Sequence, residues 1–476
     1  MIHPTAVLNV VGLTPAMIGD DTPHLRALAR DGSVAPIRAG LPAVTCTAQA
    51  TYLTGTLPRQ HGIVGNGWYF RDLAQVMFWK QSNQLVSGEK VWETARRRDP
   101  AITCAKMFWW YNMYSSADWS VTPRPIYPAD GRKIPSIYGY PADLTTRLTA
   151  EIGPFPFFNF WGPTADIRSS QWIADASLLV DEWMSPSLSL IYLPHLDYNL
   201  QRLGPADPRI REDLRAIDAI CGRLIDGLRA RGRRIIVLSE YGLTAVSRPI
   251  HINRALREAG LLAVRDELDT DALDAGASEA FAVSDHQVAH VYVRDRGRIG
   301  DVKALLEKLP GVDTVLTGAD IAAAGLDHER SGELVAVSAA DAWFTYYYWL
   351  DDARAPDFAR TVDIHRKPGY DPAELFVDPS IPLPTLKVGY TLAKKKLGFR
   401  YLMEMIPLDA SIVRGSHGRI TDRPEDGPVF MSSEKNAANG VVDGVGDGVG
   451  DGSVPCTAIR DAMLAHLFDQ VPGTTR

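Results

Sequence analysis

LSLIYL, residues 188–193, is a short apolar run with the length of a buried strand. After a polar loop, apolar residues recur every three or four positions from Ile210 to Leu228, which predicts an amphipathic helix that ends near Gly232. The apolar run 235–238 then predicts a second buried strand. A strand, a helix and a strand in this order indicate a parallel sheet, and we therefore predict an α/β fold.

Other segments extend this sheet. Residues 6–11 form a Val-rich run typical of a buried parallel strand, and helices are expected at about 22–30 and 46–54, the second ending at Gly55. Ligands of open α/β sheets bind beyond the carboxyl ends of the strands. The residues of interest are therefore those that follow the strands: Gly12 to Pro15, Thr45, Pro194 to Gln201 and Glu240 to Leu243.

Composition narrows the class of protein. The chain has 476 residues, 50 basic and 57 acidic side chains, and a net charge of -7, which argues against nucleic acid as a partner. Any anionic ligand is expected to be small and locally held. The four cysteines are scattered, which indicates neither a disulfide scaffold nor a cysteine zinc site. Neither a signal peptide nor a transmembrane run is evident, so we expect a cytoplasmic location.

The domain organisation is predicted as one α/β body, residues 1–430, with two insertions at about 100–165 and 340–410 and a small subdomain at about 280–335. A Gly/Asp repeat at 443–451 predicts a flexible loop over 431–454, followed by a C-terminal helix within 455–476. Aromatic residues cluster at 108–114, 155–161 and 343–349. We expect these aromatic clusters in or around a pocket that the insertions cover.

Thr45 is the strongest single candidate for chemistry. A hydroxyl at a strand-to-helix junction lies beside unpaired backbone N–H groups and the positive end of the helix dipole, which favours a bound phosphate. A plain helix N-cap is the alternative for Thr45. The neighbouring Cys46 is a weaker candidate nucleophile, because no adjacent base is evident in the sequence.

The motifs around Thr45 carry a family resemblance. They are LPAVTC at 41–46, ATYLTG at 50–55, PRQHGI at 58–63 and GN at 65–66, and further matches occur at 192–205, 238–242, 256–261 and 416–418. In order and spacing they resemble the type I phosphodiesterases/nucleotide pyrophosphatases of the alkaline phosphatase superfamily. The resemblance covers most of residues 5–420 and implies a central, mostly parallel sheet sandwiched by helices. It also implies that Thr45 attacks phosphorus and that Asn66 donates to a non-bridging oxygen.

The resemblance further implies divalent metals, with zinc as the family's ion. Asp197 and His417 match ligands of one ion, and Glu240 replaces an aspartate ligand of the other. Three positions have lost a good ligand: Val11, Gln201 and Tyr241. We therefore expect a modified metal site at Asp197, Glu240 and His417, holding fewer ions than the family does or none.

Several other side chains are candidates for the same site. His195 and Tyr241 are predicted to bind substrate or act as a base, and an extended backbone would turn His195 and Asp197 to the same side. The remaining candidates, each also readable as structural, are Asp285, His286, His290 and His365. His61 is expected to be structural, and core packing is the alternative for Tyr241.

Residues 386–406 combine basic and apolar side chains, which predicts a basic amphipathic helix. It is either a peripheral contact to an anionic membrane or a solvated helix face. A membrane contact would favour a lipid-linked phosphate or diphosphate substrate.

Together these features predict a phosphoester hydrolase that acts on a small phosphate or diphosphate ester through Thr45 and Asn66. One alternative is a non-catalytic protein that binds a phosphate ligand, since three ligand positions are lost. The other is a metal-independent group transferase with His195 or Tyr241 as the base.

Overall fold

The computed structural model describes residues 2–129, 132–435, 437 and 452–469. Its body is a nine-stranded sheet in the order β21-β2-β20-β9-β1-β8-β5-β6-β7. The five central strands run parallel, which confirms the predicted mostly parallel α/β sheet: β9 (Arg234–Leu238), β1 (Thr5–Val10), β8 (Leu188–Leu193), β5 (Cys104–Met107) and β6 (Trp119–Pro123). The outer strands are β20 (Val429–Ser432), β2 (Ser33–Arg38), β21 (Val454–Pro455) and β7 (Ile137–Tyr140).

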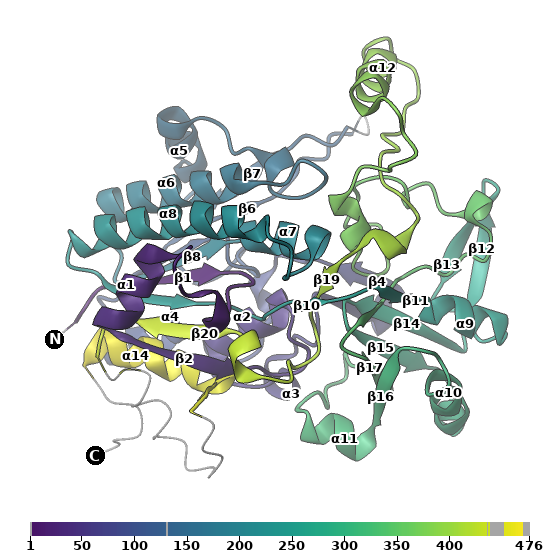
Figure 1. Cartoon of the computed structure of the whole chain (residues 1–476), viewed down its shortest axis with the longest axis horizontal. Coiled ribbons are helices and arrows are strands. Elements are labelled where there is room, and N and C mark those ends of the chain that lie inside the picture. Colours follow the sequence, from purple (N-terminus) through teal and green to yellow (C-terminus); the bar gives the residue numbers. More distant parts are fainter. Residues whose placement is uncertain (1, 130–131, 436, 438–451, 470–476) are drawn as a thin grey trace.

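Helices cover both faces of the sheet (Figure 1). One layer holds α1 (Pro23–Asp31), α6 (Ile167–Met184) and α8 (Ile210–Arg229), and the other holds α2 (Thr45–Thr54), α4 (Val91–Arg98) and α14 (Ile459–Phe468). The apolar positions of α8 are buried against β9, α6 and α1, as its periodicity predicts.

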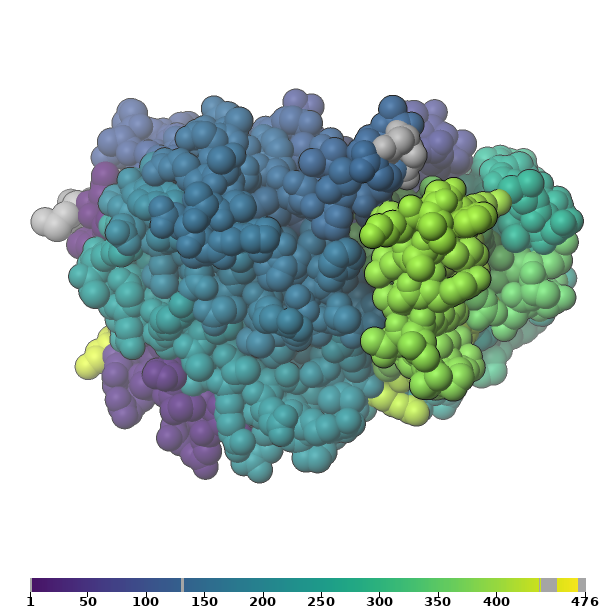
Figure 2. Space-filling model, turned by 90° about the horizontal axis from the view of Figure 1, so that it is seen from above, coloured from purple at the N-terminus to yellow at the C-terminus, as the bar shows by residue number. Residues whose placement is uncertain are grey.

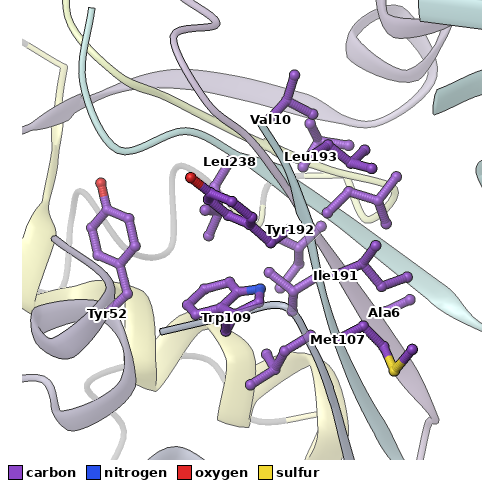
Figure 3. Packing of buried hydrophobic residues seen from close by; sticks show 14 of the residues in the cluster. Ala6, Val10, Tyr52, Met107, Trp109, Ile191, Tyr192, Leu193 and Leu238 are labelled. Atoms are coloured by element: carbon purple, nitrogen blue, oxygen red, sulfur yellow. The ribbon is translucent and has the colours of Figure 1, made fainter. Parts of the chain in front are cut away.

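The two innermost strands, β1 and β8, are mostly apolar because both of their faces are covered. Every residue of β1 and β8 is buried, and Val10 lies opposite Leu193 (Figure 3). Asn9 is a polar residue within this core, level with Tyr192 of β8 and Leu238 of β9. The carboxyl ends of these strands face the candidate site.

A second, four-stranded antiparallel sheet adjoins the body in the order β14-β15-β17-β16. Its strands are β14 (Ala280–Asp285), β15 (Val288–Val293), β17 (Leu334–Ser338) and β16 (Val312–Thr317). The helix α10 (Ile299–Leu306) packs against β16 and β17. The aromatic run 343–349 packs inside the core beside this sheet and does not line the pocket, so its expected place was wrong.

The second insertion carries α12 (Pro384–Lys396), which stands away from the body (Figure 1). The predicted helix at 386–406 is therefore shorter, because Gly398 has a positive φ of 80° just past its end. The predicted loop 431–454 begins within β20 and ends at β21, and its repeat at 443–451 lies outside the described residues. No described helix is both long and apolar enough to span a membrane.

Candidate active site

Thr45 is the first residue of α2 and lies at the carboxyl edge of the central sheet. Val44 is the N-cap of this helix, and no side-chain capping bond is present, so Thr45 is not a plain cap. Its Oγ1 lies 3.2 Å from the hydroxyl oxygen of Tyr241. Thr45 also lines a cavity beside Asn66. The hydroxyl is thus open to a ligand while it is held by a second hydroxyl.

The cavity above Thr45 has a volume of about 490 Å³ and is largely aromatic. Its wall includes residues from 110–161 and from 362–370, which lie within the two predicted insertions. Trp79 and Trp110 lie with ring centroids 4.7 Å apart, and Tyr370 adjoins Trp79 at 5.8 Å. Other lining residues are Tyr114, Tyr127, Phe157, Phe160, Trp161 and Tyr198, with the basic side chains Lys80, Arg124 and Lys133.

A chain of hydrogen bonds leads from Thr45 into the protein. The Tyr241 hydroxyl donates to Asp197 Oδ1 at 3.3 Å. Gln201 Nε2 donates to Asp197 Oδ2 at 2.6 Å, because the two residues lie four apart on one face of α7 (His195–Leu203). Burial raises the pKa of Asp197 to about 7, against the opposing effect of these two hydrogen bonds.

Glu240 lies behind Thr45 and is fully buried. Its Oε1 accepts hydrogen bonds from Asn9 Nδ2 and Gln49 Nε2, both at 2.6 Å. Its Oε2 has no hydrogen-bond partner in the described structure. Burial raises the pKa of Glu240 to about 8, so the carboxyl is mostly neutral at pH 7.

Asn66 is fixed by three hydrogen bonds. Its Oδ1 accepts from the backbone N–H of Cys46 at 2.9 Å, and its Nδ2 donates to Asp285 Oδ1 at 3.1 Å. Its backbone N–H donates to Asp285 Oδ2 at 2.7 Å. The side-chain amide keeps one further hydrogen for a ligand in the cavity. Cys46 is fully buried, and burial raises its pKa well above the usual range, which excludes it as a ready nucleophile.

Two of the candidate histidines reach the site as neutral rings. The pairing of β10 (Thr244–Ala245) with β19 (Gly415–Ser416) brings His417 beside Tyr241, and their rings stack with centroids 3.5 Å apart. His286 lies 3.7 Å from the His417 ring on the other side. Burial lowers the pKa of His417 to about 3 and that of His286 well below its usual range.

The other candidate histidines lie elsewhere. His195 does not line the cavity, and its Nε2 lies 3.0 Å from Asp213 on α8. The segment from 195 is helical and not extended, so His195 and Asp197 point to different sides. His290 bonds the carbonyl of Val64, and His61 bonds Thr51 inside the protein, whereas His365 lines the cavity.

The predicted metal ligands do not fit a divalent ion in this arrangement. Both Asp197 oxygens are bonded by neutral donors, and one Glu240 oxygen accepts from two amides. His417 Nδ1 bonds the carbonyl of Ala43 at 2.8 Å, and the Tyr241 ring covers its face. Among the described residues, no three His, Cys, Asp or Glu side chains are arranged to hold a metal.

Sequence reasoning missed the amides and the tyrosine that complete this network. Gln49 lies four residues after Thr45, which places both on one face of α2. Asn9 interrupts an otherwise apolar buried strand, and a buried polar residue needs a partner. Those two signals were available in the sequence. Tyr370, from the second insertion, has no comparable local signal.

This chain is similar to known proteins both in sequence and in fold. The family model for "Type I phosphodiesterase / nucleotide pyrophosphatase" matches residues 5–371. An uncharacterized pyrophosphatase/phosphodiesterase of Schizosaccharomyces pombe is 26% identical over 238 residues, which are 48% of this chain and only 41% of that relative.

Two solved structures illustrate the likeness in fold. Phosphonoacetate hydrolase of Sinorhizobium meliloti, in complex with phosphonoformate, superposes with a TM-score of 0.61 at 14% identity, covering 98% of this chain and 96% of that one. An inactive threonine-to-alanine variant of murine ectonucleotide pyrophosphatase/phosphodiesterase 5, in complex with AMP, gives a TM-score of 0.57 at 14% identity, with coverages of 100% and 97%. At this identity the likeness shows the fold alone.

Proposed function

This chain belongs to the type I phosphodiesterase/nucleotide pyrophosphatase family, and we propose that it hydrolyses phosphoric esters through the hydroxyl of Thr45. One observation carries the proposal. The Thr45 hydroxyl opens into a large cavity, has Asn66 beside it, and is hydrogen-bonded to a tyrosine that leads to a buried carboxyl.

The proposed reaction needs a route for the proton of Thr45. As Oγ1 forms its bond to phosphorus, its proton passes to the Tyr241 oxygen, and the tyrosine proton passes to Asp197 Oδ1. The bond from phosphorus to the leaving oxygen breaks, and that oxygen takes a proton from solvent. Water then attacks phosphorus and loses a proton to solvent, the bond from phosphorus to Oγ1 breaks, and Oγ1 takes its proton back from Asp197 through Tyr241. The Asn66 amide donates to a non-bridging oxygen throughout.

The electrostatics of the site suit this route. A phosphate would be repelled by several ionised carboxylates, but Glu240 is mostly neutral at pH 7. The positive end of the α2 dipole lies at Thr45 and favours an anion there. The proposed route includes no metal ion, because the side chains at the implied ligand positions already form hydrogen bonds with one another.

The cavity indicates the class of substrate. Its wall is mainly aromatic, which favours a phosphate ester whose organic part is apolar or aromatic. Basic side chains at the wall, Lys80, Arg124 and Lys133, favour a second anionic group further out. AMP in the murine relative and phosphonoformate in the bacterial one are both small phosphorus-containing anions, in accord with this size.

The test compares two substitutions at Thr45 with the purified chain and the phosphodiester bis(p-nitrophenyl) phosphate. Thr45→Ala is expected to lower kcat/KM by roughly a thousandfold or more, because the nucleophile is lost. Thr45→Ser keeps a hydroxyl and is expected to stay within about tenfold of the wild type. Equal activity of the alanine variant and the wild type would refute Thr45 as the nucleophile.

A chelator separates this mechanism from metal catalysis. Activity is expected to persist in EDTA, since the proton route uses Tyr241 and Asp197 alone. Loss of activity in EDTA, with recovery in zinc or manganese, would instead favour an ion held at Asp197, Glu240 and His417.

A non-catalytic phosphate-binding protein is the second candidate. The observation that favours it is the set of neutral donors that already bond both oxygens of Asp197 and one oxygen of Glu240. Calorimetric binding of AMP, with no turnover of phosphodiesters or phosphomonoesters by any preparation, would support it. Turnover that Thr45→Ala abolishes would exclude it.

A further inference from the structure

We propose that α12 docks on an anionic membrane surface and so presents the cavity to the lipid headgroups. The helix stands away from the body and is joined to it by two irregular segments, residues 376–383 and 397–409, which together form its stem (Figure 1). Three large apolar side chains on it are mostly exposed, at 67% for Leu386, 66% for Tyr390 and 73% for Leu397. Large apolar side chains that are exposed together on a protein surface are typical of an interaction site.

The helical spacing places these side chains on one outer side. Leu386 and Tyr390 lie four residues apart, and Leu397 follows seven residues later, directly after the helix ends. The inner side is different: Val388 packs against Met405 and Ile406 of the stem, and Thr391 is buried. The helix therefore holds its apolar side outward by packing the other side on the protein.

The positive charge of residues 383–403 indicates that the partner of α12 is anionic. Residues 383–403 contain Lys387, Lys394, Lys395, Lys396 and Arg400 and no acidic residue, although the whole chain has a net charge of -7. In the described part of the chain none of the five forms an ion pair. Lys387 donates to the backbone carbonyl of Glu404, and Lys394 and Lys395 lie over the rings of Tyr390 and Tyr401, but none of these partners is a carboxylate. Basic side chains that keep their charge around an apolar stripe match the headgroup and acyl layers of a bilayer that contains anionic lipid.

The stem connects the helix to the mouth of the cavity. The backbone N–H groups of Met405 and Ile406 donate to the carbonyl of Arg360, and Val362, two residues on, lines the cavity. Seen from above, the segment that carries α12 (light green) lies alongside the blue first insertion, which supplies another part of the cavity wall (Figure 2). A membrane bound by α12 would therefore lie near the entrance for a lipid phosphate.

The experiment is co-sedimentation of the full chain with vesicles of phosphatidylcholine alone or with one third phosphatidylglycerol. Binding to the anionic vesicles is expected to be at least tenfold stronger at 0.1 M NaCl and to fall about tenfold at 0.5 M, because salt screens the lysines. Absence of binding to anionic vesicles would overturn the proposal, and so would equal binding to both.

Variants assign the binding to the helix. Leu386→Asp and the double change Lys394→Glu/Lys395→Glu are each expected to lower anionic-vesicle binding at least tenfold. Leu268→Asp is the matched control, because Leu268 is 86% exposed on the distant hairpin of β12 (Ala263–Glu267) and β13 (Thr270–Asp274). Circular dichroism melts check that all variants fold.

Two outcomes would overturn the assignment to α12. One is unchanged vesicle binding by both helix variants. The other is a dimer of the wild type in sedimentation equilibrium that Leu386→Asp dissociates without changing vesicle binding. The readout is sedimentation and not turnover, so its failure leaves the proposed hydrolysis intact.

Discussion

Replacing Tyr241 by phenylalanine tests the proposed proton route by removing one oxygen atom. That oxygen lies 3.2 Å from Thr45 Oγ1 and 3.3 Å from Asp197 Oδ1, and the structure gives Thr45 no direct bond to Asp197. The aromatic ring remains, and its stacking on His417, at 3.5 Å with an interplanar angle of 6°, does not need the hydroxyl. The variant therefore interrupts the route while it preserves the packing.

The expected effect on catalysis is larger than that on stability. General-base catalysis contributes typically 10²–10⁴-fold, so kcat/KM is expected to fall at least about 100-fold, or about 2.7 kcal/mol in activation free energy. The lost hydrogen bonds cost about 1–2 kcal/mol of folding free energy. That loss leaves the protein folded if its stability is the usual 5–15 kcal/mol.

The assay is kcat/KM with bis(p-nitrophenyl) phosphate, with Tyr370→Phe as the matched control. Tyr370 is also buried and lines the cavity, but its hydroxyl bonds Gln201 and not Thr45, so a change below about tenfold is expected. Asp197→Asn is expected to be about as impaired as Tyr241→Phe, and the double variant no worse, because the two act as one unit. Activity of Tyr241→Phe within threefold of the wild type, or strictly additive losses, would refute the route.

Three further predictions concern stability and substrate binding. Lys367→Met is expected to cost about 3–5 kcal/mol in urea unfolding, because the buried ammonium lies 2.6 Å from Asp371 and 2.7 Å from Glu374 and the change leaves two buried carboxyls unpaired; a loss below about 1 kcal/mol would contradict this. Burial lowers the pKa of His61 to about 3, so the unfolded chain binds a proton below pH 6.5 that the folded chain does not, and the stability due to a neutral His61 is lost as pH falls. Between pH 6.5 and 4.5 that loss is up to about 2.7 kcal/mol, and urea unfolding of His61→Gln should show a shallower slope over this range unless the assignment is wrong. Trp110→Leu is expected to raise KM for the nitrophenyl ester about tenfold with kcat within threefold, and an unchanged KM would remove Trp110 from the binding surface.

The central sheet was predictable because its signals are local. The apolar runs at 188–193 and 235–238, with the helical spacing from Ile210 between them, are typical of a buried parallel unit. The structure contains all three elements. The expected place of the aromatic run 343–349 was wrong because composition alone does not distinguish a buried core from the wall of a pocket. Its place is decided by packing in one core with the antiparallel sheet that precedes it in the sequence, and composition does not show that packing.

The candidate site was predictable where the motif residues carry the resemblance. Thr45, Asn66, Asp197 and Tyr241 meet at one cavity although they are spread over almost 200 residues. His195 does not line this cavity, because the backbone after β8 is helical and turns its side chain to another side than that of Asp197. The positions of Asn9 and Gln49 carry a signal in the sequence, but the sequence does not show that both donate to Glu240, which lies 231 and 191 positions away.

The substitutions at the implied metal positions have a common explanation in the negative charge of the buried carboxylates. Loss of the two implied metal ions, with no other change, would leave buried carboxylates without a positive partner. Each such charge costs several kcal/mol. In this chain the replacements supply donors: Gln201 and Tyr241 both bond Asp197. A site that only bound phosphate would need the Asp197 charge neutralised, but it would gain nothing from joining that carboxyl to Thr45. The bridge that Tyr241 makes between them therefore favours the proposed proton transfer over the loss of a metal site without a new function.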